Sequence, residues 1–399
     1  MKSTLRWVAV ALLIPGAAAA QDLTWGGQVR IRGELRDPFP GIEGEGITFT
    51  SMRTRANLRA ALDGDVSIFI QIQDVRLFGE ESNSLGDFSA QGLDMHQAYL
   101  DIGSMGNDLF GRFGRQEVNY GGQRLVGAVG WTQQGRSFDG ARLEGAGGFG
   151  VVSLLGARLG NDVSPFVDQD GALLAGYSTL DISESQDVDL YVIYNGSAGD
   201  GDTSEDETDQ FTFGARWVGE AAKLRYRAEG SLQKGDRGGR NVSAFMLGGR
   251  LARAFGDFTA TLWYDYLSGS DDPLEGDAKV FDTLFATNHK FYGFADLFLN
   301  IPLHTGGQGL QDAAVKLAFT PHADWRLAAD GHSFHLAKTG TLDSRHLGEE
   351  IDLIVSWKHS ANLDITGGVA FVFQRDAWAQ IDRLDENLIW GYLMLDAHF

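Results

Sequence analysis

The sequence predicts an all-β protein, an 18-stranded antiparallel transmembrane β-barrel of the outer-membrane type with short periplasmic turns and long outer loops. Three observations favour this fold. Many short segments alternate apolar and polar residues with a period of two. The connections between these segments alternate between long and short. The chain ends on the aromatic Phe399 of a final alternating segment.

The first 20 residues have the pattern of a secretory signal peptide. Lys2 and Arg6 form a positive start, residues 7–14 are apolar, and small residues lead to a cleavage site near Ala20. The alternative is a buried N-terminal helix. Beyond Ala20 no apolar run approaches the roughly 18 residues that a membrane helix needs. We therefore expect an exported chain whose residues 21–399 form one barrel domain in the outer membrane of a Gram-negative cell.

Strict alternation marks strands with one apolar and one polar face. In residues 28–35, for example, Val29, Ile31 and Leu35 share one face, and Arg30, Arg32 and Glu34 share the other. Residues 223–233 and 351–358 repeat the pattern. In a soluble sandwich the apolar face would meet a second sheet, whereas in an outer-membrane barrel it meets lipid.

Connection lengths favour the barrel over the sandwich. Short gaps such as residues 145–148 alternate along the chain with long gaps such as residues 119–133, as in bacterial barrels. Another candidate strand at residues 290–299 would give an odd number, so we assign it to a loop. The expected strands are 24–36, 48–62, 65–78, 93–103, 108–118, 134–144, 149–159, 172–181, 187–195, 208–219, 222–234, 241–252, 256–268, 310–320, 324–337, 348–360, 363–375 and 387–399.

Aromatic residues fit the same interpretation. On the final strand Phe399 shares its face with Leu395 and Leu393, which resembles the C-terminal assembly signal of outer-membrane proteins. Five tryptophans lie near strand ends or on outward faces, which is consistent with aromatic girdles, although core packing is the alternative for each one alone. They are Trp217, Trp263, Trp325, Trp357 and Trp390.

If the apolar residues face lipid, many basic residues face the lumen. Rings of Arg or Lys let an aqueous pore select anions, and the planar fork of Arg suits carboxylates. The alternative is that these cations pair with lumen acids such as Glu34, Glu117 and Glu229 and brace the wall. The cations are Arg30, Arg32, Arg53, Arg55, Arg59, Arg142, Lys223, Arg225, Arg227, Lys316 and Arg326.

Residues 269–309 are the best candidate for a constriction element. This connection is too long for a plain turn, and it carries many aromatic residues, which burial in the barrel mouth would shield from water. Packing against a neighbouring protomer is the alternative. The aromatic and basic residues of this segment include Phe281, Phe285, His289, Lys290, Phe291, Tyr292, Phe294 and Phe298.

Charge and composition exclude several function classes. The formal net charge of −21 disfavours nucleic acid as a partner, and the absence of cysteine excludes disulfides, thiolate metal sites and a catalytic thiol. His332 and His335 are three apart on a strand and cannot share a metal. The acidic run at residues 200–209 departs from a calcium loop. No nucleophile motif is present, so we expect neither an enzyme nor a cofactor.

Several motifs resemble the alginate-export family of outer-membrane porins. They lie at residues 67–80, 94–100, 114–117 (Gly-Arg-Gln-Glu), 135–140 (Gly-Arg-Ser-Phe-Asp-Gly), 287–293 (Thr-Asn-His-Lys-Phe-Tyr-Gly) and 347–353. The resemblance covers nearly all of the mature chain. It implies an 18-stranded barrel with an arginine-rich, electropositive constriction through which an anionic polyuronate leaves the cell. By resemblance, the constriction is shaped by Arg115, Glu117, Arg136, Asp139, His289 and Lys290.

Three functions follow as expectations. The first is an outer-membrane channel that passes an anionic polysaccharide by passive diffusion. The second is a substrate-specific porin for small anionic nutrients such as uronates or other carboxylates. The third is a structural barrel with a closed lumen. The expected partners are the anionic solute, outer-membrane lipid and lipopolysaccharide, with periplasmic secretion proteins in the case of export.

Overall fold

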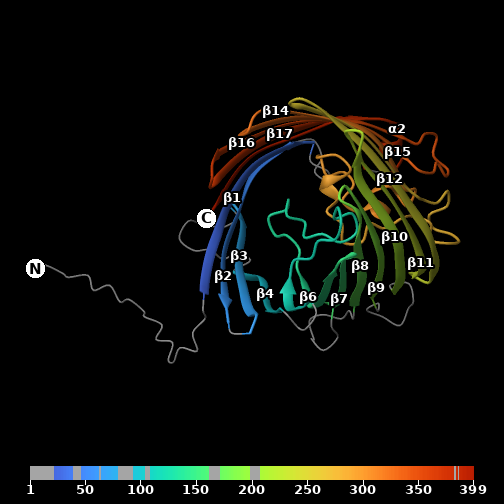
Figure 1. The fold of residues 1–399 in the computed structure, drawn as a ribbon. Coiled ribbons are helices and arrows are strands. Elements are labelled where there is room, and N and C mark those ends of the chain that lie inside the picture. The colour runs from blue at the N-terminus through green and yellow to red at the C-terminus, as the bar shows by residue number, and fades with distance from the viewer. Residues whose placement is uncertain are drawn as a thin grey trace, which may run out of the picture.

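The computed structural model describes residues 22–38, 46–62, 64–79, 93–103, 108–160, 171–197, 207–381, 383–384 and 386–399. Within them 18 antiparallel strands form one closed sheet, because β1 pairs with both β2 and β18 (Figure 1). The predicted fold is confirmed. The predicted signal peptide and the acidic run at residues 200–206 lie outside the described residues.

Each expected strand is present, with ends that differ from the expectation by a few residues at most. Residues 290–299 form no strand, as expected. Among the described residues no helix is long and apolar enough to cross a membrane. The strands are β1 (Asp22–Asp37), β2 (Ile47–Ala61), β3 (Val66–Leu77), β4 (Asp94–Ile102), β5 (Leu109–Gln116), β6 (Phe138–Gly147), β7 (Gly150–Gly160), β8 (Gly171–Ser183), β9 (Gln186–Ser197), β10 (Thr208–Ala221), β11 (Leu224–Arg237), β12 (Arg240–Phe255), β13 (Phe258–Leu267), β14 (Leu310–His322), β15 (Trp325–Leu336), β16 (His346–Ser360), β17 (Leu363–Gln374) and β18 (Leu388–His398). The helical turns are η2 (Asn288–Lys290), α1 (Ile301–His304) and α2 (Asp376–Gln380).

Long and short connections alternate around the barrel with one exception. The β11–β12 connection lies on the side of the long loops but consists only of Gly238 and Gly239. Both glycines have positive φ, as a tight hairpin turn requires. At the opposite end Ala222 and Lys223 form the β10–β11 turn with positive φ. Lys223 therefore belongs to a turn and not, as predicted, to the lumen face of a strand.

The outward faces of the strands carry apolar side chains. Leu262 is 61% exposed, and Leu251 and Leu353 are also exposed. At the seam between β1 and β18, Phe399 exchanges two backbone hydrogen bonds with Gly27, both 3.1 Å long. A Cβ atom at position 27 would lie 2.6 Å from the Phe399 ring, so glycine lets the ring lie against the β1 backbone.

Two of the five predicted girdle tryptophans face the lumen instead. Trp390 is 1% exposed, and its indole N–H donates to the Glu34 carboxylate at 3.2 Å. Trp263 lies under the guanidinium group of Arg227, 4.6 Å from it. Charged lumen side chains thus bind the polar edge or the face of these rings, as buried tryptophans require. The other three fit the prediction: Trp217 and Trp325 are exposed, and Trp357 stacks on Trp325.

Two connections fold into the barrel and supply most of its interior core. Residues 268–309 bury Phe281, Phe291 and Phe298 inside their own barrel. The segment therefore folds into the barrel interior, as the sequence analysis expected, and its role as a constriction element stays a prediction. Residues 117–137, expected only as a long outer connection, also cross the lumen, as the blue-green coil in Figure 1 shows.

Candidate functional site

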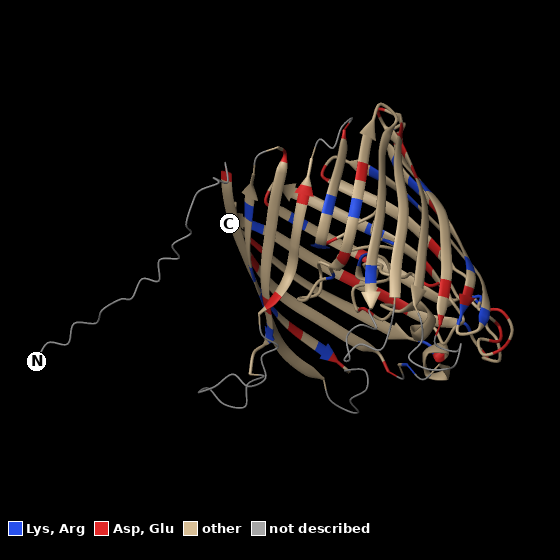
Figure 2. Cartoon of the chain, turned by 90° about the horizontal axis from the view of Figure 1, so that it is seen from below, with Lys and Arg blue, Asp and Glu red and all other residues tan. Residues whose placement is uncertain are grey.

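A cluster of arginines projects from β1 and β2 into the lumen. Arg30 and Arg53 are register partners across the two strands, and Arg32 and Arg55 flank them. Strand alternation places all four on the inner face, as predicted. Arg30 and Arg53 are only 4% and 3% exposed. Figure 2 shows how charges of both signs are distributed over the strands.

The arginine cluster binds the backbone of residues 130–134, which we call the inner segment. Arg30 donates to the carbonyls of residues 130, 131 and 132 at 2.8, 3.1 and 2.6 Å. Arg32 donates to carbonyl 131 at 2.8 Å, and Arg53 donates to carbonyls 132 and 133 at 3.2 and 3.4 Å. Arg55 donates to carbonyl 134 at 3.4 Å. Five consecutive carbonyls therefore face the four guanidinium groups.

The arginine cluster is poor in carboxylates. Arg32 forms an ion pair with Glu34 at 2.7 Å, and Arg55 forms one with Glu117 at 3.3 Å. Arg30 and Arg53 form none within the described part of the chain. Their remaining donors bind the neutral side-chain oxygens of Gln133 and Gln28. The wall formed by β1 and β2 thus carries a net positive charge.

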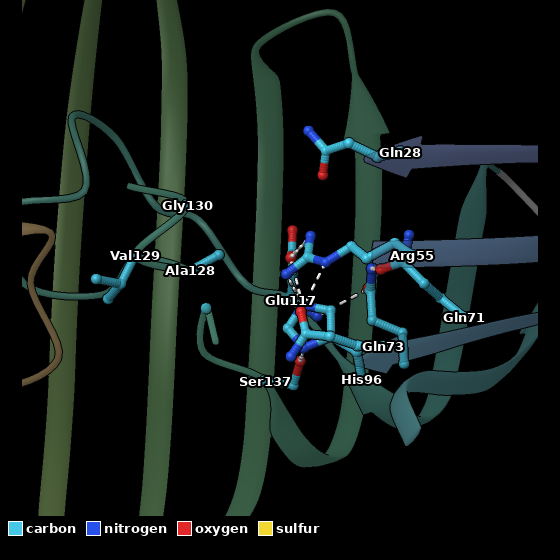
Figure 3. A network of polar contacts seen from close by, with 12 residues as sticks. Gln28, Arg55, Gln71, Gln73, His96, Glu117, Ala128, Val129, Gly130 and Ser137 are labelled. Carbon is cyan, nitrogen blue, oxygen red and sulfur yellow. Dashed lines mark hydrogen bonds and ion pairs between the residues drawn. The ribbon is translucent and has the colours of Figure 1, made fainter. Parts of the chain in front are cut away.

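Arg55 also belongs to a polar network with His96 and Glu117 (Figure 3). Nε2 of His96 lies 2.7 Å from the Glu117 carboxylate and 2.9 Å from Arg55, which in turn donates to Gln73 at 2.7 Å. Burial alone would raise the pKa of Glu117. The hydrogen bond with His96 and the charge of Arg55 outweigh burial and lower this pKa. Glu117 is therefore ionised at the start of residues 117–137, directly after β5.

Arg124 anchors residues 117–137 to the opposite wall. Its side chain is 1% exposed and forms ion pairs with Asp265 at 2.8 Å and Glu229 at 3.2 Å. It also donates to the Tyr292 hydroxyl at 3.0 Å. Burial alone would lower the pKa of Arg124, but the neighbouring carboxylates outweigh burial and raise it. The sequence analysis missed this residue, although an arginine in a long glycine-rich connection facing acidic strands was the available signal.

Four further predicted residues also lie in the interior with partners of their own. Arg59 pairs with Asp101 at 3.1 Å, and Arg142 pairs with Glu144 at 3.1 Å. Arg136 donates to the backbone carbonyl of Phe285, and Arg227 lies 4.0 Å from Glu229 and from Asp265. Burial lowers the pKa of Arg136.

The structure does not bring the other predicted residues into the arginine cluster. Arg115 pairs with Asp139 at 2.7 Å, and Asp139 is exposed beside the inward-pointing Phe138. His289 is the exception, because it stacks on Trp131 of the inner segment with ring centroids 4.0 Å apart, and the Arg32 guanidinium lies 4.3 Å from the centre of the same indole ring. The exposed residues Lys290 and Arg225 lie elsewhere, in η2 and near the start of β11. Partial burial lowers the pKa of Lys290.

Strands β13 to β16 form an acidic wall that the sequence analysis missed. Asp265, Asp312, Glu350 and Asp352 are fully or almost fully buried there. Residues 268–309 cover this wall, since the Ala295 N–H donates to Glu350 at 2.8 Å. His332 contacts Asp312 at 2.9 Å, whereas His335 stacks on His346. Among the described residues no group of three or more His, Asp or Glu side chains is placed to hold a metal ion.

A polar hollow of about 1000 Å³ lies between the inner segment and the wall of β1 to β5. Charged and amide side chains line it, and it reaches the ends of these strands that carry the long loops. Its lining includes Arg32, Ser51, Gln73, His96, Arg115 and Gln134.

Comparison with solved structures shows the porin barrel. OccAB4 of Acinetobacter baumannii aligns with a TM-score of 0.66 at 9% identity, over 95% of this chain and 99% of that chain. OpdO of Pseudomonas aeruginosa aligns with a TM-score of 0.62 at 14% identity, over 95% and 97%. The outer-membrane protein OprD of P. aeruginosa gives 0.62 at 11% identity, over 94% and 93%. At these identities the likeness shows the fold alone.

Sequence comparison identifies the family. No curated protein matches the chain. The family described as "Alginate export" matches residues 21–383, which is most of the chain. The motifs quoted above lie inside this range, and the barrel has the strand number that the resemblance implied. The chain belongs to the alginate-export family.

Proposed function

We propose that this outer-membrane channel passes an anionic polysaccharide of the polyuronate type by passive diffusion. The observation that carries the proposal is the arginine cluster on the net positive wall of β1 and β2: within the described residues, two of its four arginines have carboxylate partners, and Arg30 and Arg53 have none. Family membership and the porin barrel support the outer membrane as the location.

The arginines would act through weak contacts at several positions. Each guanidinium can donate two parallel hydrogen bonds to a carboxylate while keeping its charge. Successive sites from Arg32 through Arg53 and Arg55 to Arg59 would let a charged chain enter and leave without tight binding at one point. Arg136, which donates to a backbone carbonyl, would add positive charge in the interior, whereas the charges of Arg142 and Arg227 are offset by the carboxylates beside them.

A porin for small carboxylates such as single uronates is the second candidate. The observation in its favour is that residues 117–137 and 268–309 both occupy the lumen, with Arg124 tied to the opposite wall. A polymer requires a continuous passage past these segments, whereas a monosaccharide fits a hollow of the size found here.

The refolded barrel in a planar bilayer tests both candidates. A salt gradient gives the anion-to-cation permeability ratio, and polyuronate and a monomeric uronate are then added as blockers. The variant Arg53→Gln removes one lumen charge, and Arg253→Gln is a matched control, because Arg253 is exposed on the outward face that Leu251 shares.

Anion preference with polyuronate block that weakens in Arg53→Gln but not in Arg253→Gln supports the polysaccharide channel. Anion preference with block by the monomer only supports the small-solute porin. A barrel that conducts without anion preference, or that does not conduct, refutes both.

A further inference from the structure

The two central arginines of the proposed anion pathway cannot touch a solute in this structure. Arg30 and Arg53 are 4% and 3% exposed, and residues 130–134 cover them. Every nitrogen of the Arg30 guanidinium donates to this segment: Nε to the Gln133 side chain at 2.9 Å and both Nη atoms to its carbonyls. A solute therefore reaches these groups only if the inner segment leaves them.

The charge at this position points to an anion. Arg30 and Arg53 lie opposite each other, and neither has an ion pair within the described residues. Asp396, the β18 register partner of Arg30, accepts hydrogen bonds from Gln28 at 2.7 and 3.0 Å, and Gln28 in turn accepts from Arg53, so this one carboxylate faces two cations without pairing directly with either. The carbonyls offer only the negative ends of neutral dipoles. A solute carboxylate would make hydrogen bonds that are roughly twice as strong and would pair directly with the guanidinium groups.

The inner segment is placed to move as a unit. Gly127 and Gly135 flank it, and Gly135 has a φ of +69°. Val129, just before it, has a φ of +50°, which a β-branched residue adopts only under strain. Release of the segment would remove this strain. The ion pairs of Arg124 would meanwhile keep the preceding residues attached to the opposite wall.

We propose that residues 130–134 are an internal stopper, whose row of carbonyls occupies the site that the cargo's carboxylates take on Arg30 and Arg53. An anionic solute competes with the stopper, displaces it and so opens the pathway along β1 and β2. This inference rests on the proposed function, because it takes a uronate as the competing ligand.

Weakening the stopper's attachment while keeping the arginines tests the competition. Gln133→Ala removes the side-chain bond to Arg30 and the 2.9 Å bond to Ser51. The apparent affinity for monomeric galacturonate, measured from block of single-channel current, should rise about tenfold, because the docked stopper no longer competes as strongly. Ser51→Ala removes the second bond, together with the 3.4 Å bond from Ser51 Oγ to the Arg32 carbonyl within the wall, and should cause a smaller rise. The test therefore stands even if Gln133→Ala does not fold.

Two controls separate competition from other effects. Arg253→Gln alters an exposed side chain on the outward face, away from the arginine cluster and from the hollow, and should leave the affinity unchanged. Arg53→Gln should lower the affinity, because it removes part of the binding site.

The outcomes distinguish this inference from the proposed function. A rise in affinity for Gln133→Ala or Ser51→Ala, with no change for Arg253→Gln, supports the stopper. An unchanged or reduced affinity for both, in a channel whose galacturonate block still depends on Arg53, overturns the stopper and leaves the proposed function intact. Absence of galacturonate block and of anion preference in every variant overturns both.

Discussion

Replacement of Arg124 by methionine should release residues 117–137 from the far wall of the barrel. The change removes two ion pairs and the bond to the Tyr292 hydroxyl. It leaves Asp265 and Glu229 buried with one cation fewer between them. Breaking a buried ion pair by removing one partner costs about 3–5 kcal/mol.

Hydrogen exchange of the loop amides measures this cost directly. The Gly127 amide donates to the carbonyl of Phe285, and the Thr287 amide donates to that of Gln123, both at 2.9 Å. These bonds join residues 117–137 to residues 268–309 and should open when Arg124 is lost. Since each tenfold step corresponds to about 1.4 kcal/mol, their exchange rate should rise about 100-fold or more.

Matched variants show whether the effect belongs to this ion pair. Arg142→Met breaks a pair within β6 that touches neither of these hydrogen bonds, so it should change the exchange of these amides little. Asp265→Asn in the Arg124→Met background should restore part of the protection, because one unpaired carboxylate is neutralised. A rise below threefold in Arg124→Met would refute the anchoring role.

Three further outcomes are expected. Because the pKa of Glu117 is lowered in the folded chain, its ion pair with Arg55 stabilises the structure above the ordinary glutamate pKa of about 4.3, and this contribution is lost as the pH falls through the lowered pKa. The noise of the single-channel current should therefore grow on acidification in the wild type and grow less in Glu117→Gln. Equal growth in both would contradict this reasoning. In variants that retain a single tryptophan, brominated lipids should quench the fluorescence of Trp325 but not that of Trp390. Quenching of both would contradict the inward placement of Trp390. Leu251→Lys places a charge on the exposed apolar face and should destabilise the barrel in lipid vesicles by up to about 4 kcal/mol in urea titrations, whereas an unchanged midpoint would contradict a lipid-facing position.

The strands were predictable from the sequence because a barrel wall has one physical rule. Each strand meets lipid on one side and the interior on the other, so its polarity alternates with every residue. The same rule placed the arginines of β1 and β2 correctly. Applied strictly, it would also have placed Trp390 inside, because its neighbour Ile389 and Leu393 face outward.

The destination of the loops was harder to predict. Residues 117–137 have no periodicity, and their anchors are single long-range contacts such as that of Arg124 with Asp265. Residues 268–309 were recognised because aromatic rings cannot stay exposed in such numbers. For Arg30 and Arg53 the alternation predicted that the side chains face inward, but it did not predict what they bind. Every residue has a backbone carbonyl, so the residue types do not show which carbonyls accept these hydrogen bonds.

The seam between β1 and β18 has a consequence for folding. It joins Gln28 to His398, so the sheet closes only when opposite ends of the barrel-forming chain meet. Until then both strands are open edges, whose unpaired N–H and C=O groups can recruit other chains. Contacts this distant in sequence form slowly. Substitutions at Gly27 should therefore reduce the yield of assembled barrel and increase aggregation before insertion, while barrels that do close remain long-lived.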